Sequence, residues 1–232
     1  MDLPPPVLDV PASFTATVFE AFSSRRGPRF ALVLSGGPTA RLCYEHLASH
    51  SDAIDWSLVD LYVGDERQVP PDDDDANQRL IREALVDPLT AAGTPPGSFS
   101  PMRTELPVDE CVADYQRTIA DLLDGPGIDL IHLGVGDDGH TASLFPGSPT
   151  LDAPSTELVT ATRDPNERNP HARLTLTFPA IDRARQAVFT VSGQSKADAV
   201  AALRRGEDLP ASRVAAAQVT WLIDDTAAAP SP

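Results

Sequence analysis

The chain has 232 residues, of which 41% are hydrophobic and 22% charged, an ordinary composition for a globular protein with one core. Its formal net charge of −16 argues against a nucleic-acid partner, because phosphate backbones bind basic surfaces. We expect no membrane attachment, since apolar runs such as Phe30–Leu34 are only strand-length and the N-terminus has no signal-peptide pattern.

The acidic charge also constrains how an anion could bind. The overall field repels anions, so a phosphate-binding site must gather the few cations of the chain in one place. Those cations are 17 arginines and a single lysine, Lys196. The two cysteines, Cys43 and Cys111, show neither metal-ligand nor redox spacing and are expected to be buried thiols in a reducing cytoplasm.

Short apolar runs alternate with stretches of helical periodicity along the chain. This alternation predicts one doubly wound α/β domain over residues 1–232, with a mostly parallel sheet. In chain order, the predicted strands are Arg29–Ser35, Leu58–Val63, Ile128–Gly134, Leu158–Thr162, Leu174–Phe178, Ala187–Val191 and Val219–Ile223. The predicted helices between them are Ser13–Ser24, Thr39–Ser49, Asn77–Leu85, Asp109–Leu123 and Ser195–Arg204.

The first polar segment follows the first predicted strand and opens a helix. Ligands of open parallel sheets bind outside the carboxyl ends of the strands, which is where Ser35, Gly36 and Gly37 lie. Bare backbone next to a helix N-terminus can bind an anion, and Thr39 adds a hydroxyl. A glycine pair after a strand is, by itself, more often a plain turn.

The second polar segment places Asp65, Glu66 and Arg67 at the carboxyl end of the second predicted strand. A solvated loop is the alternative interpretation, and it stays open most of all for Glu66. The acidic run Asp72–Asp75 precedes the helix that begins at Asn77, so we expect it to place favourable negative charge at that helix N-terminus.

The third segment follows the strand Ile128–Gly134 and is the most informative. Asp138 and His140 stand on either side of Gly139, on a turn that begins at Gly136. A neutral imidazole beside a carboxylate is a general base with a partner that orients it. The pattern therefore predicts acid–base chemistry at His140.

The other histidines indicate no further chemistry. His132 lies in the middle of a predicted strand and is expected to pack in the core, whereas His46, His50 and His171 are expected on the surface. The spacing of the five histidines and two cysteines resembles no metal cluster, so we expect no metal.

Two later segments add positive charge. Arg173 opens a predicted strand, and Arg168 precedes it by five residues. Lys196 lies in the first turn of the helix Ser195–Arg204, where the helix dipole disfavours a cation. A phosphate bound nearby would offset that cost.

Together these segments resemble the 6-phosphogluconolactonases, a branch of the group that includes glucosamine-6-phosphate deaminases. The resemblance extends from Phe30 to Leu203, and the match at Leu133–Pro146 is the most specific. The other matching motifs, in family order, are Ser35–Ala40, Gly64–Arg67 with Asp75–Asn77, Arg173–Thr177 and Gly193–Lys196. The chain departs from the family pattern at Pro38, Ala40, Ala76 and Arg168.

The resemblance implies a Rossmann-like fold with helices on both faces of the sheet, and hydrolysis of 6-phosphogluconolactone in the oxidative branch of the pentose phosphate pathway. His140 would be the general base, oriented by Asp138. Arg67 would stabilise charge on the carbonyl oxygen, and Asp65 would hold Arg67 or a sugar hydroxyl. The expected substrate- and phosphate-binding residues are Ser35, Gly36, Gly37, Thr39, Asn77, Gly139, Arg168, Arg173 and Lys196.

Two alternatives remain. Amino-sugar phosphate deaminases carry a glutamate just before the proline that follows Asp-Gly-His, where this chain has Phe145. A non-catalytic sugar-phosphate sensor would not need His140 and would usually carry a basic DNA-binding segment. We therefore expect a cytoplasmic hydrolase without cofactors, a monomer or small homo-oligomer, whose partner is the small phosphosugar lactone.

Overall fold

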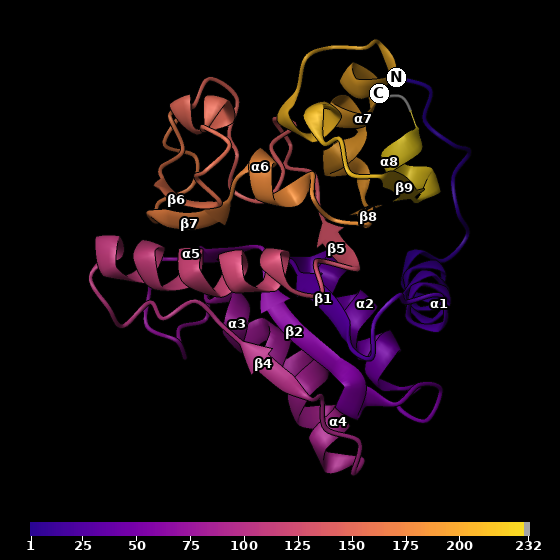
Figure 1. Ribbon diagram of the computed structural model, residues 1–232. Coiled ribbons are helices and arrows are strands. Elements are labelled where there is room, and N and C mark those ends of the chain that lie inside the picture. The colour runs from indigo at the N-terminus through magenta and orange to yellow at the C-terminus, as the bar shows by residue number, and fades with distance from the viewer. Residues whose placement is uncertain (230–232) are drawn as a thin grey trace.

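A computed structural model describes residues 1–229 and shows a six-stranded sheet at the centre of the molecule (Figure 1). Every pair of neighbouring strands in this sheet is parallel. The spatial order is β4 (Ser98–Ser100), β2 (Val59–Val63), β1 (Phe30–Leu34), β5 (Leu130–Leu133), β8 (Gln186–Val191) and β9 (Gln218–Ile223). The chain therefore winds outward in both directions from β1 and β5, which is the topology of Rossmann-like folds.

Helices cover both faces of the sheet. The longer ones are α1 (Val10–Ser23), α2 (Pro38–Ala48), α5 (Val108–Asp124) and α7 (Ala197–Arg204). A second group is short: α3 (Asn77–Ile81), α4 (Asp87–Ala91), α6 (Phe178–Ile181) and α8 (Asp225–Ala228). The π-helix Arg82–Val86 joins α3 to α4, so the predicted helix from Asn77 continues to Ala91.

The residues of β1 show how the sheet divides the core. All five are buried, and successive side chains of a strand point to opposite faces. Phe30, Leu32 and Leu34 join a hydrophobic cluster with α1 and α2, whereas Ala31 and Val33 join another with α5 and α7. The continuous apolar run thus reflects a strand covered on both sides, which confirms the predicted doubly wound α/β fold.

A small antiparallel sheet stands apart from the main one, and it corrects the sequence-based assignment. Its order is β3 (Asp65–Arg67), β7 (Arg173–Leu176) and β6 (Val159–Thr162). Two predicted strands, Leu158–Thr162 and Leu174–Phe178, therefore do not belong to the parallel sheet. The segment between them contains no helix, and without a crossover helix two consecutive strands pair antiparallel.

The small sheet is held against the main body through α5, which lies between β6 and the strands of the large sheet (Figure 1). Its first strand, β3, follows β2 after only Gly64. This connection places Asp65 and Arg67 at the junction of the two sheets. None of the helices formed by residues 1–229 has the length and apolar character needed to cross a membrane.

Candidate active site

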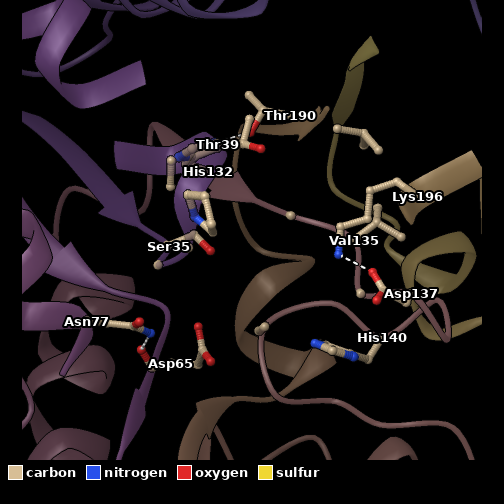
Figure 2. Close-up of a pocket in the computed structure, with 18 of the residues that line it drawn as sticks. Ser35, Thr39, Asp65, Asn77, His132, Val135, Asp137, His140, Thr190 and Lys196 are labelled. Carbon is tan, nitrogen blue, oxygen red and sulfur yellow. Dashed lines mark hydrogen bonds and ion pairs between the residues drawn. The ribbon is translucent and has the colours of Figure 1, made fainter. Parts of the chain in front are cut away.

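A cavity of about 360 Å³ opens at the carboxyl ends of β1 and β5, where the strand order reverses. Small-molecule sites commonly have volumes of about 300–1,000 Å³ and lie at this point of doubly wound sheets. Its polar and charged lining residues are Ser35, Thr39, Asp65, Arg67, Asn77, His132, Asp137, Asp138, His140, Arg168, Asn169, Thr190, Ser192 and Lys196. Figure 2 shows Asp65 and Asn77 on one side and His140, Asp137 and Lys196 on the other.

The glycine loop, defined here as Gly36 and Gly37, joins β1 to α2 and lines this cavity. Gly37 is the N-cap residue of α2 and has a φ of 99°, a backbone conformation that favours glycine. Its lack of a side chain leaves the first N–H groups of α2 without a side-chain cap. Free N–H groups at the positive end of a helix dipole can bind an anion.

His140 and Asp138 form a directly bonded pair on the cavity wall. The imidazole Nδ1 lies 2.6 Å from Asp138 Oδ1, which also accepts the backbone N–H of His140 at 3.0 Å. Burial raises the pKa of Asp138, but these hydrogen bonds lower it by a larger amount. The resulting pKa is about 2. Because an ionised carboxylate only accepts, Nδ1 must donate, and the lone pair of His140 is on Nε2.

Nε2 of His140 is available for chemistry. It has no hydrogen-bond partner among residues 1–229, and the side chain is 22% exposed on the cavity wall. The ring packs against Phe145, with 4.8 Å between ring centroids, and passes so close to Gly136 that a Cβ there would collide with it. The loop therefore fixes the imidazole by contacts on its other sides and leaves one nitrogen facing the cavity.

Asp65 and Arg67 reach the cavity from β3. Ser143 donates a hydrogen bond of 2.6 Å to Asp65 Oδ2, so Ser143 serves to hold a carboxylate. Arg67 donates to the backbone carbonyl of Asp75 through Nη1, while its buried Nε has no partner among the described residues. These bonds orient a carboxylate and a guanidinium at the same end of the site.

Glu66 lies between them in sequence but faces the interior, so the solvated-loop interpretation is wrong for this residue. It is fully buried and accepts the backbone N–H groups of Arg67, Asn77 and Gln78 at 2.7–2.8 Å. Burial raises its pKa to about 7 against the opposing effect of these hydrogen bonds. The acid that meets the first N–H groups of α3 is therefore Glu66.

Asn77 continues this arrangement into the cavity. Its Nδ2 donates to the backbone carbonyl of Asp65 at 2.8 Å, and its Oδ1 is buried without a partner in the described part of the chain. Asp72–Asp75 stand directly before α3, where a favourable charge effect stays a prediction, and they also make specific contacts. The backbone carbonyl of Asp72 and the carboxylate of Asp74 bind Arg79.

Two further cations line the cavity. Lys196 is the N-cap residue of α7 and forms an ion pair of 2.5 Å with Asp137, which offsets the unfavourable helix dipole (Figure 2). Arg168 is exposed and has no ion pair or hydrogen bond within residues 1–229. Its guanidinium is free to meet an anion.

Arg173 and Gly139 are predicted site residues that lie outside the set of described residues lining the cavity. Arg173 opens β7 as expected, but it is only 7% exposed, and it donates to Asn169 at 2.9 Å and lies 3.8 Å from Asp65 Oδ2. Gly139 supplies the turn that carries His140, with a φ of 83°. The structure thus places both behind the cavity wall.

Several lining residues were not predicted as site residues. Asp137, Asn169 and Thr190 reach the cavity from separate segments, and only tertiary structure brings them together. His132 is buried, as its position in mid-strand predicted, yet it also borders the cavity. Residues 1–229 bring together no group of three or more His, Cys, Asp and Glu side chains that could hold a metal.

Comparisons with known proteins relate this site to a family. The family model described as glucosamine-6-phosphate isomerases/6-phosphogluconolactonase matches residues 8–222. A 6-phosphogluconolactonase of Mycobacterium tuberculosis is 38% identical over 214 residues, covering 87% of this chain and 85% of that protein. A 6-phosphogluconolactonase of Synechocystis sp. is 37% identical over 207 residues, covering 84% and 82%.

Solved structures agree. The crystal structure of a 6-phosphogluconolactonase from Thermotoga maritima superposes with a TM-score of 0.76 at 28% identity, covering 92% of this chain and 96% of the other. A monomeric glucosamine-6-phosphate deaminase shares the fold with a TM-score of 0.77, at only 20% identity.

Proposed function

The chain belongs to the glucosamine-6-phosphate isomerase/6-phosphogluconolactonase family, and we propose that it opens the lactone ring of 6-phosphogluconolactone with His140 as the general base. The observation that carries the assignment of the base is the orientation of His140. Its Nδ1 is held by ionised Asp138, and its Nε2 faces the cavity that the glycine loop also lines.

The chemistry follows from that orientation. Nε2 takes a proton from a water molecule as the water oxygen attacks the ring carbonyl carbon. Asp138 stabilises the imidazolium that forms, and a positioned base of this kind contributes about 10²–10⁴-fold to the rate. When the tetrahedral intermediate collapses, the bond from carbon to ring oxygen breaks. The imidazolium then returns its proton to that oxygen, which leaves as a hydroxyl.

Arg67 is the proposed partner of the developing oxyanion. It lines the same cavity as His140 and reaches it from β3. A preorganised donor aimed at developing charge can contribute a factor of roughly 10²–10³. Asp65, held by Ser143, would bind a sugar hydroxyl, with Asn77 beside it in the cavity lining and bonded to the backbone carbonyl of Asp65.

The phosphate would bind at the start of α2. The glycine loop, Ser35 and Thr39 offer backbone and hydroxyl donors there, and Arg168 and Lys196 bring positive charge to the same cavity. Three of the chain's cations, Arg67, Arg168 and Lys196, line this cavity, which supports anion binding there in a protein with a net charge of −16. Arg173 acts in this proposal through Asp65 and Asn169.

The two alternatives are less well supported. A deaminase would need a second acid near His140, but the buried Phe145 packs there. A sensor would have no use for the His140–Asp138 pair. The single-domain organisation, cytoplasmic location, monomeric or small homo-oligomeric state, and lack of a nucleic-acid partner stay predictions, as does activity without metal or cofactor.

The decisive assay measures acid release from freshly prepared 6-phosphogluconolactone, corrected for spontaneous hydrolysis. We expect enzyme-dependent ring opening that persists after treatment with a chelator. Ammonia release from glucosamine 6-phosphate at a comparable rate would assign the chain to the other branch of the family. Activity that is lost with chelator and restored by a divalent ion would contradict the metal-free mechanism.

A further inference from the structure

A chain of buried, hydrogen-bonded side chains lies beneath the glycine loop and takes no part in the proposed chemistry. It links Tyr44 of α2, His132 of β5 and Thr190 of β8, each no more than 3% exposed. The Tyr44 hydroxyl lies 2.8 Å from His132 Nδ1, and His132 Nε2 lies 2.8 Å from Thr190 Oγ1. Figure 2 shows His132 with Ser35 on one side and Thr190 on the other.

The hydrogen-bonded series Thr190–His132–Tyr44 ends on the backbone of Ser35, the residue that precedes the glycine loop. The N–H of Ser35 donates to the Tyr44 hydroxyl at 2.8 Å, and its carbonyl lies 2.9 Å from the same oxygen. The pairing of β1 stops before Ser35, at Leu34 on one side and at Val33 on the other. Because buried backbone groups need partners, the phenol takes over where the sheet ends.

Counting donors and acceptors assigns the tautomer of His132. A phenol oxygen donates one hydrogen bond and accepts two. The Ser35 N–H can only donate and the Ser35 carbonyl can only accept, so His132 Nδ1 must donate to the phenol. Nε2 is then the acceptor, and the Thr190 hydroxyl donates to it. Burial keeps this imidazole neutral by lowering its pKa to about 3.

We propose that Tyr44 and His132 are positioning residues for phosphate binding, with His132 held as the Nδ1–H tautomer so that the phenol can bind both backbone groups of Ser35. This inference rests on the proposed role of the glycine loop as the phosphate site. With the opposite tautomer, the phenol would donate to His132, and the Ser35 carbonyl would lose its donor.

A second tyrosine provides a matched control. Tyr115 of α5 bonds both backbone groups of Val63 at the end of β2, accepting the N–H at 2.8 Å and lying 3.0 Å from the carbonyl. Like Tyr44, it is buried, but its third neighbour is the Ser100 carbonyl at 3.2 Å in place of a histidine. Val63 leads to Asp65, and Ser35 leads to the glycine loop. Each phenol therefore binds the backbone at the end of one strand, but the two strands lead to different parts of the site.

The tautomer is tested by nuclear magnetic resonance on the ¹⁵N-labelled wild-type protein, with His132→Asn used to assign the imidazole signals. We expect the proton on Nδ1 and an unprotonated Nε2 throughout the neutral pH range. A proton on Nε2 would overturn the inference, and this measurement does not depend on the enzyme's activity or on how any tyrosine variant folds.

The positioning role is tested by comparing 6-phosphogluconolactone with unphosphorylated gluconolactone. Tyr44→Phe and His132→Leu should lower kcat/KM for the phosphorylated lactone about tenfold, mainly through KM, and change the other substrate little. His132→Asn should recover most of the loss, because an asparagine Nδ2 can donate from the position of Nδ1. Tyr115→Phe should affect both lactones by similar factors.

The outcomes separate the two proposals. If the wild-type protein opens neither lactone, the proposed function fails, whatever the tautomer of His132. If the wild-type protein is active but Tyr44→Phe lowers kcat/KM equally for both lactones, the positioning role is wrong while the lactonase assignment stands.

Discussion

Strand β5 and the loop that follows it each carry one histidine, and the two differ in every respect that matters for chemistry. His132 in the strand is 1% exposed and has a partner on each ring nitrogen. His140 in the loop is partly exposed, and only its Nδ1 is bonded among residues 1–229. A histidine with both nitrogens engaged can hold structure, whereas one with a free, oriented nitrogen at a cavity can transfer protons.

The partners explain this difference. His140 is bonded to the carboxylate of Asp138, which can stabilise the positive charge that a base acquires during turnover. His132 is bonded to two neutral hydroxyl groups and covered by Phe14, at 4.3 Å between ring centroids. Nothing in that environment would stabilise a proton taken from water. Eight residues of sequence thus separate a residue suited to catalysis from one suited to positioning.

The largest expected effect tests the catalytic side of this comparison. His140→Gln keeps a polar side chain of similar length but removes the basic nitrogen, so we expect kcat to fall by about 10²-fold or more. Steady-state kinetics on 6-phosphogluconolactone, with circular dichroism to verify folding, measures it.

His171→Gln is the matched control, since His171 also pairs with an aspartate, Asp75, at 2.8 Å, but lies outside the described cavity lining. We expect its kcat to stay within a few-fold of wild type. A folded His140→Gln variant that also stays within a few-fold would contradict the assignment of the base.

Much of this contrast was predictable from the sequence, because it depends on local signals. The apolar run through His132 predicted burial, and the glycines around Asp138 and His140 predicted an exposed turn with a general base. Periodicity also predicted the longer strands and helices in their order, but not the short strands β3 and β4 or the short helices α6 and α8. Each of these features depends only on residues that are close to one another in the sequence.

What the sequence did not predict depends on contacts between distant segments. Burial of Glu66 results from α3 folding back so that two of its N–H groups reach the carboxylate. The antiparallel sheet needs β3 to pair with β7, more than a hundred residues later. The Tyr44–His132–Thr190 chain joins three elements for the same reason. Pattern alone contains no information on such pairings.

The next prediction extends the contrast between cavity-facing and buried groups to a pair of arginines. Arg168 is exposed and lines the cavity, whereas Arg173 is buried behind Asp65. Arg168→Ala should reduce kcat/KM for the phosphorylated lactone by roughly 10–100-fold, because it removes charge-assisted hydrogen bonds to the phosphate. Gluconolactone turnover should change little.

Arg173→Ala should instead lower kcat/KM for both lactones by similar factors and reduce the melting temperature, because it removes a buried partner of Asp65 and Asn169. If Arg173→Ala impairs only the phosphorylated substrate, Arg173 contacts the phosphate directly, as its sequence motif suggested. Equal losses on both lactones in Arg168→Ala would place the phosphate elsewhere.

A smaller effect should appear in how the stability of the protein depends on pH, because of the buried His132. The pKa of His132 is lowered to about 3, so between that value and an unfolded pKa of about 6.5 the unfolded chain binds the extra proton. Stability is therefore lost as pH falls, by about 2 kcal/mol between pH 7 and pH 5. Tyr44 and Cys43 nearby do not titrate there, since burial raises the pKa of both.

Urea unfolding of wild type and His132→Asn at pH 7 and pH 5 isolates this contribution. The variant should be less stable at pH 7 but should lose about 2 kcal/mol less than wild type on acidification. Parallel losses in the two proteins would mean that His132 accepts a proton within the fold, and the neutral hydrogen-bonded chain would then be wrong.

The smallest expected effect concerns Asp138, whose pKa the fold also lowers, but by stabilising the charged form of the group and not the neutral form as in His132. The pKa of Asp138 is lowered to about 2, so its charged form is the one stabilised by the fold. That stability is complete above the unfolded pKa of about 3.9 and is lost as pH falls towards the folded value, about 1 kcal/mol of it between pH 5 and pH 3. Asp138→Asn should lack this loss, whereas His132→Asn should retain it, as urea unfolding at the two pH values would measure. In both cases stability falls because the unfolded chain binds the proton more readily than the folded protein, which keeps His132 neutral and Asp138 ionised. An Asp138→Asn variant that loses as much stability as wild type between pH 5 and pH 3 would show that the His140–Asp138 bond contributes little to the fold.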